Sequence, residues 1–151
     1  MSKNKTSIWS IIILVATIIS LVLLVSGVIT LAIGVPAVSE AAKQSAIESG
    51  ATADEAAMIA TIALVGVIVV FVLTSILDIL KIVGGFLFSL KGRWGIFCIV
   101  VSILGAIGAV GSLVSDIRSK VGAMSIVIDA LTIAVDVLLV VACFKHRAEI
   151  Q

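Results

Sequence analysis

Residues 8–35 read IWSIIILVATIISLVLLVSGVITLAIGV, an almost continuously apolar stretch that decides the fold class of this chain. No charged residue occurs from Thr6 to Ser39. A helix needs about 20 apolar residues to cross the hydrocarbon core of a bilayer, which is about 30 Å thick. The apolar region of a secretory signal peptide is shorter, about 7–15 residues. The stretch therefore predicts a transmembrane helix, with some tilt, rather than a signal peptide.

The composition of the whole chain supports the same class. Of its 151 residues, 62% are hydrophobic and 13% are charged, whereas charged residues make up about 25% of a typical soluble domain. The formal net charge is +1, so the chain has no bulk attraction for nucleic acids. We therefore exclude a soluble domain, a disordered chain and a nucleic-acid-binding protein, and expect a single transmembrane domain over residues 1–151.

Three further apolar stretches complete an expected all-α architecture, an integral membrane four-helix bundle with antiparallel helices. The spans are expected at about 8–35, 56–90, 95–115 and 122–144. A polar outer loop over 36–55 separates the first two spans, and its Val38–Ser49 segment is compatible with a short surface helix that stops at Gly50. Only Asp116–Lys120 separates the last two spans, which must therefore form a hairpin.

The second span has a clear start and an ambiguous end. Thr52-Ala53-Asp54-Glu55 matches a capping box, in which a hydroxyl and a carboxylate bond the free N–H groups of a helix start. The helix ends either near Leu80 or near Leu90. We favour Leu90, with a kink at Gly84-Gly85, because a loop over 82–90 would expose unpaired backbone groups to lipid.

Lysine and arginine residues set the expected orientation, because cytoplasmic loops carry an excess of both. One side of the expected topology holds six of them, Lys3, Lys5, Lys91, Arg93, Lys145 and Arg147, and the other side holds three, Lys43, Arg118 and Lys120. We expect the first side to be cytoplasmic. Both termini would then lie inside and the 36–55 loop outside.

Four ionisable residues fall inside the expected spans: Asp78, Lys81, Asp129 and Asp136. A charge at the centre of a membrane costs about 2.5–3.5 kcal/mol on insertion scales, so such residues are candidates for function. Lys81 is expected to pair with Asp78, with Asp136, or with both. A polar face on the fourth helix includes two of these acids, because its residues are four, three and four positions apart: Ser125, Asp129, Thr132 and Asp136.

Two interpretations of these residues remain open. In the first, which we favour, Lys81 neutralises a carboxylate and the pair holds the bundle together. In the second, Asp129 and Asp136 form a proton or cation path on a face lined by serine and threonine. The excess of three carboxylates over one lysine keeps the second interpretation open.

Small residues recur at the spacing that favours close helix packing. They are Ser26, Thr30 and Gly34 in the first span and Gly105, Gly108, Ala109 and Ser112 in the third. This pattern predicts helix–helix contacts, either within the chain or between copies. Lys91 and Arg93 lie at a membrane boundary and are candidates for contacts with lipid headgroups.

The sequence lacks the motifs that would indicate catalysis or a cofactor. No HExxH, GxSxG, CxxC or phosphate-binding loop occurs. We expect no catalytic residue, no metal site and no cofactor. His146 lies between Lys145 and Arg147 and is expected to be solvated, while Cys98 and Cys143 are expected to act as small apolar residues.

Two segments carry a resemblance in layout: Ser49–Ala56, which ends the outer polar loop, and the basic turn Lys91–Gly95, which opens a glycine-rich third span. With four short spans, this layout resembles small bacterial four-span proteins grouped as domains of unknown function. The resemblance implies no catalytic residues. We expect a non-enzymatic interaction or accessory subunit that packs in the lipid bilayer against itself or another membrane protein. The alternative is an oligomeric proton or cation conductor that uses Asp129 and Asp136.

Overall fold

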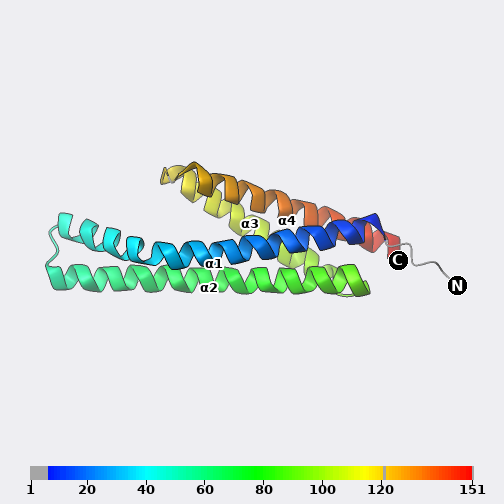
Figure 1. Ribbon diagram of the computed structural model, residues 1–151, viewed down its shortest axis with the longest axis horizontal. Coiled ribbons are helices and arrows are strands. Elements are labelled where there is room, and N and C mark those ends of the chain that lie inside the picture. Colours follow the sequence, from blue (N-terminus) through cyan, green and yellow to red (C-terminus); the bar gives the residue numbers. More distant parts are fainter. Residues whose placement is uncertain (1–6, 121, 151) are drawn as a thin grey trace. The chain divides into compact units, whose positions relative to one another are not determined.

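A computed structural model of the chain describes residues 7–120 and 122–150 (Figure 1). Over these residues the fold consists of four α-helices: α1 (Ile8–Glu48), α2 (Ala53–Lys91), α3 (Gly95–Arg118) and α4 (Ala123–Ile150). Each helix is long and apolar enough to cross a membrane. The expected all-helical class is confirmed, and the four candidate spans suggest a multi-pass membrane protein.

The longest helix, α1, differs most from the sequence expectation. It runs through Pro36 without interruption and ends at Glu48, so most of the expected 36–55 loop is helical. Proline removes a single backbone hydrogen bond, and the alanine-rich segment beyond it contains many strong helix formers. Gly50 has a left-handed φ of 93° just beyond the helix end, as expected for a helix stop. With 41 residues, α1 is about 61 Å long, roughly twice the thickness of a hydrocarbon core.

The start of α2 carries the expected capping box. The backbone N–H of Thr52 donates to Glu55 Oε2 at 2.8 Å, and the N–H of Glu55 donates to Thr52 Oγ1 at 3.4 Å. Glu55 lies outside the expected spans, and hydrogen bonds from the Thr52 backbone and hydroxyl hold the pKa of its carboxyl below the usual value. The helix continues past Leu80 and Gly84-Gly85 to Lys91, so the longer alternative is confirmed and the helix is not interrupted at the expected kink.

Short turns connect the remaining helices. Between α2 and α3, Gly92 (φ 64°) and Trp94 (φ 72°) both have left-handed backbone conformations, and α3 begins at Gly95 as expected. α3 and α4 pack side by side (Figure 1). α4 continues to Ile150, so the segment from Lys145, which was expected to be a polar tail, is helical.

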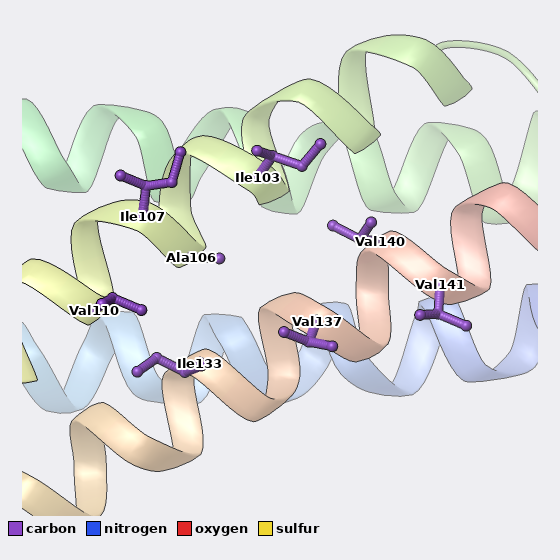
Figure 2. A pocket seen from close by; sticks show the side chains of 8 residues that line it. All are labelled: Ile103, Ala106, Ile107, Val110, Ile133, Val137, Val140 and Val141. Atoms are coloured by element: carbon purple, nitrogen blue, oxygen red, sulfur yellow. The ribbon is translucent and has the colours of Figure 1, made fainter.

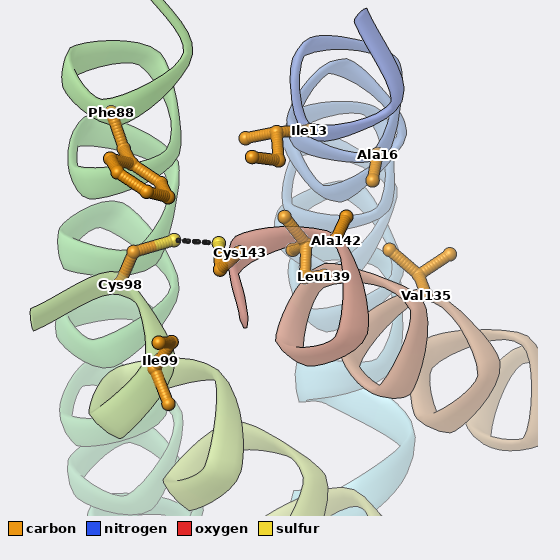
Figure 3. Close-up of a cluster of buried hydrophobic side chains, with 9 residues drawn as sticks. All are labelled: Ile13, Ala16, Phe88, Cys98, Ile99, Val135, Leu139, Ala142 and Cys143. Atoms are coloured by element: carbon orange, nitrogen blue, oxygen red, sulfur yellow. Dashed lines mark hydrogen bonds between the residues drawn. The ribbon is translucent and has the colours of Figure 1, made fainter. Parts of the chain in front are cut away.

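The described residues divide into two compact units. The first unit comprises the chain up to Leu23 and from Leu77 onward, and it contains α3, α4 and one end of both α1 and α2. The second unit, Leu24–Ile76, holds the other parts of α1 and α2. All four helices contribute to the apolar core of the first unit, which consists of Ile13, Ala16, Phe88, Cys98, Ile99, Val135, Leu139, Ala142 and Cys143 (Figure 3).

Candidate functional site

Three of the ionisable residues expected inside the spans meet at Lys81, on α2 in the first unit. Its Nζ lies 2.8 Å from Asp136 Oδ1 of α4 and 2.9 Å from Asp78 Oδ1, one helical turn away on α2. The side chains of Lys81 and Asp136 are 4% and 1% exposed, while that of Asp78 is 35% exposed. Of the alternatives considered for Lys81, the structure has the one in which it pairs with both carboxylates. We call Asp78, Lys81 and Asp136 the ionic cluster.

α3 approaches the ionic cluster because Gly105 has no side chain. A Cβ atom added to Gly105 would lie 3.0 Å from Asp136 Oδ2 and 3.7 Å from Lys81 Nζ. Asp136 Oδ2 is buried and has no hydrogen-bond partner among the described residues. The sequence pattern assigned Gly105 to general helix packing and missed its place against the carboxylate. That role depends on a contact between three helices, which spacing within one helix does not reveal.

α1 contributes close packing to the first unit rather than a charge. Thr17 Oγ1 donates to the Ile13 carbonyl at 2.7 Å, and Ser20 Oγ donates to the Ala16 carbonyl at 3.0 Å. Both hydroxyls therefore bond to their own helix. Thr17 also approaches Gly85 of α2 so closely that a Cβ atom on Gly85 would collide with its hydroxyl. Glycine at this position is what allows α1 and α2 to meet here.

The four residues of the polar face on α4 lie in different environments. Asp136 is buried, whereas Ser125, Asp129 and Thr132 are only partly buried. The Thr132 hydroxyl donates to a carbonyl of its own helix at 2.9 Å. Asp129 forms no salt bridge with any described residue, and its Oδ2 is buried without a hydrogen-bond partner there. The structure brings Asp136 to Lys81 and leaves the other three residues outside the ionic cluster.

The small residues expected to pack helices also fall into different environments. Gly105 faces the ionic cluster, and Ala109 is partly buried. Gly108 of α3 and Gly34 of α1 have no atom within 4 Å of an added Cβ position. The hydroxyl-bearing members of the pattern are exposed on the described chain: Ser26, Thr30 and Ser112. Most of this pattern is therefore open to lipid or to another helix.

An apolar groove lies between α3 and α4. It has a volume of about 410 Å³ and is lined by Ile103, Ala106, Ile107, Val110, Ile133, Val137, Val140 and Val141 (Figure 2). Every lining side chain is aliphatic, so the groove suits a hydrocarbon chain or the apolar side chains of another helix. It offers no polar group to a soluble ligand.

Two further contacts in the first unit were not expected from the sequence. Cys143 Sγ of α4 lies 3.2 Å from Cys98 Sγ of α3 and donates a weak hydrogen bond to it (Figure 3). The expectation that His146 is solvated is wrong, because it is 6% exposed and packs edge-on against Phe88 with ring centroids 4.9 Å apart. His146 lies three residues after Cys143 on the same face of α4. Continuing the helical spacing into the expected tail would have indicated its burial.

The described residues contain no group of three or more His, Cys, Asp and Glu side chains that could hold a metal ion. The ionic cluster is instead a set of opposite charges at the contact of α2 and α4. No protein-family model, curated protein or solved structure matches the chain. Its function is therefore inferred from the residues and contacts described above.

Proposed function

We propose that this chain is a non-enzymatic membrane-protein subunit. It docks onto a second copy of itself or onto another membrane protein by helix packing. The observation that supports this proposal is a contrast along α3. Gly105 lies against the ionic cluster, whereas Gly108 and Gly111 have no atom within 4 Å of an added Cβ position. We call Gly108 and Gly111 the open α3 face.

The physical basis for docking is that lipid tails are as apolar as leucine, so apolar surface alone does not drive helices together. Small residues let two helix backbones approach closely, and the close approach supplies van der Waals contact. The open α3 face offers such an approach, and the aliphatic groove beside α4 offers a place for larger side chains of a partner helix. Lys81 and Asp136 pair with each other and are buried, so they are not available for docking.

The direct test is the mass of the purified protein in nanodiscs and in mild detergent. We expect a dimer or larger oligomer for the unmodified chain and a shift to monomer for Gly108→Ile with Gly111→Ile. Gly66→Ile is the matched control, because Gly66 of α2 is also an open glycine, and it should leave the mass unchanged. A monomeric unmodified protein, or equal loss of association in the control, would contradict self-docking through α3.

We further propose an antiparallel four-helix bundle in a bacterial cytoplasmic membrane, with both termini on the cytoplasmic side. The basic residues Lys91, Arg93, Lys145 and Arg147 support this orientation, because positive residues concentrate on the cytoplasmic side. Lys3 and Lys5, which also entered the count, lie outside the described residues.

The orientation is tested with a membrane-impermeant maleimide on intact cells, using single cysteines in a background of Cys98→Ala and Cys143→Ala. Ser49→Cys, between α1 and α2, should react. Arg93→Cys, between α2 and α3, should react only after the membrane is permeabilised. The opposite pattern would reverse the proposed topology.

Conduction of protons or cations is a second candidate, supported by one observation on α4. Asp129 Oδ2 and Asp136 Oδ2 are both buried without a hydrogen-bond partner among the described residues, and such oxygens can take up a proton or a cation. Flux assays in proteoliposomes test this function. Asp129→Asn with Asp136→Asn should abolish any flux, and flux no greater than that of protein-free liposomes in the unmodified protein excludes conduction.

A further inference from the structure

The end of the first unit that contains Gly92 has two adjoining cavities. One has a volume of about 780 Å³, and Lys91, His146 and Glu149 are among its lining residues. The other has a volume of about 700 Å³ and is lined by Arg147 and mainly apolar side chains. Gly92 and Ile150 line both cavities, so the two share a wall.

Basic side chains at this end lack acidic partners. None of Lys91, Arg93, Lys145 and Arg147 forms a salt bridge with a residue that the structure describes. Glu149 is the one described acidic residue that lines either cavity. It already accepts a hydrogen bond from the Ser7 hydroxyl and lies 4.0 Å from His146 Nδ1. The excess of positive charge makes this end suited to an anion.

Buried polar residues give the larger cavity a defined wall. His146 is 6% exposed, and its Nδ1 has no hydrogen-bond partner within the described chain. The edge-on contact with Phe88 helps to hold the ring in place. Ser10 and Ser89 line the same cavity, and the Ser10 hydroxyl donates to the Ser89 carbonyl at 2.6 Å. The polar wall is therefore part of the packed structure rather than a mobile surface.

The smaller cavity has the properties of a site for a hydrocarbon chain. Phe88, Phe97 and Val100 are among its apolar lining residues. Trp94 also lines it and packs edge-on against Phe97, with ring centroids 5.3 Å apart. Tryptophan is enriched where a membrane meets water, because its ring is apolar and its N–H is polar.

We infer that the two cavities together bind one anionic phospholipid, with its phosphate beside Lys91 and Arg147 and an acyl chain in the cavity next to Trp94. The phosphate chemistry alone would also suit a soluble phosphate ester, but the apolar cavity favours a lipid. This inference rests on the proposed membrane location and is independent of docking through the open α3 face. The oligomer measurement can therefore fail while the lipid site stands, and the reverse also holds.

The test is thermal unfolding of the detergent-purified protein during titration with phosphatidylglycerol, phosphatidylcholine or glycerol 3-phosphate. We expect phosphatidylglycerol to raise the melting temperature more than phosphatidylcholine does, and glycerol 3-phosphate to have little effect. Lys91→Gln with Arg147→Gln should weaken the apparent affinity for phosphatidylglycerol roughly 30-fold, since each cation near an anionic lipid contributes about fivefold. The difference in melting-temperature increase between phosphatidylglycerol and phosphatidylcholine should shrink in high salt, because salt screens the attraction between charges.

The matched control is Arg118→Gln with Lys120→Gln, which removes two exposed cations elsewhere on the first unit. It should bind phosphatidylglycerol like the unmodified protein. Equal weakening in both double variants would mean general charge attraction, and equal stabilisation by glycerol 3-phosphate would mean a soluble ligand; either result overturns the inference.

Val100→Phe keeps every charge but fills the apolar cavity, so it should also weaken lipid binding. Unchanged affinity in this variant contradicts the placement of the acyl chain.

Discussion

The two compact units of this chain bury different kinds of side chain. The first unit buries Lys81 and Asp136 as an ion pair against Gly105, beside an apolar core to which all four helices contribute. In the second unit, the buried hydrophobic residues that the structure describes are Ala46, Ala56 and Ala60. Helix packing in the first unit thus involves both charge and shape, whereas packing in the second unit involves small side chains.

The difference shows what can determine helix packing in a membrane. Apolar side chains gain little by leaving lipid for a protein interior, so most of the large apolar residues here are exposed and carry little information about helix position. A buried charge needs a neighbour of opposite sign, and a glycine beside the pair lets another helix come close to it. Lys81, Asp136 and Gly105 therefore define how α2, α3 and α4 meet, whereas alanine contacts leave more freedom.

The largest expected effect comes from breaking the ion pair of the first unit. Lys81→Met should reduce the free energy of unfolding by about 3–5 kcal/mol, because Asp136 is left as an uncompensated buried charge. Denaturant titration in mild detergent, followed by circular dichroism, measures this loss. Lys91→Met removes an exposed lysine from the same helix and should change stability by less than about 0.5 kcal/mol. A similar, small loss in both variants would show that the pair is not needed.

A smaller loss is expected from adding volume beside the pair. Gly105→Val should cost about 1–3 kcal/mol, since its Cβ atom would lie 3.0 Å from Asp136 Oδ2. Gly108→Val, one turn away, meets no atom within 4 Å of the new Cβ and should cost less than about 1 kcal/mol in monomeric protein. The same unfolding titration compares the two variants. Equal losses of stability in the two variants would show that Gly105 is packed no more tightly than Gly108.

The smallest expected effect concerns the second unit. Thr52→Ala removes the hydroxyl of the capping box and should cost about 1 kcal/mol, measured as faster hydrogen exchange at the start of α2. Exchange in α3 and α4 should not change. Protection lost equally in both units would mean that they unfold together.

The capping box should also depend on pH in a defined direction. The pKa of Glu55 is lowered by its hydrogen bonds from Thr52. Its contribution is therefore present above the unfolded pKa of about 4.3 and is lost as the pH falls through the lower value of the folded state. The difference in stability of the start of α2 between Thr52→Ala and the unmodified protein should shrink in acid. A stability difference that grows in acid would contradict this account.

Local signals in the sequence predicted several helix limits correctly. Thr52 and Glu55 identified the start of α2, because a helix start with a capping box depends on a few adjacent residues. The end of α1 was predicted wrongly, because the polar 36–55 stretch was expected to be a loop outside the membrane, whereas its alanine-rich part continues the helix to Glu48. Local sequence signals therefore predict a helix limit correctly when interactions between neighbouring residues determine that limit.

The candidate site was only partly predictable for a related reason. Lys81 and Asp136 stood out because a charge inside a membrane is costly, and that cost holds whatever the fold is. The partner of Lys81 and the role of Gly105 depend on which helix faces meet, and this is a property of the assembled bundle. His146 was missed because α4 was expected to end before it.

The central claim is that the ionic cluster holds the first unit together, and a double-mutant cycle between Lys81 and Asp136 tests it most directly. The cycle compares the free energies of unfolding of Lys81→Met, Asp136→Asn and the double variant in the same detergent. We predict that Asp136→Asn partly restores the stability lost in Lys81→Met, with a coupling energy of at least about 1 kcal/mol, since residues in direct contact are not additive. Additive losses, with no rescue in the double variant, would contradict the account.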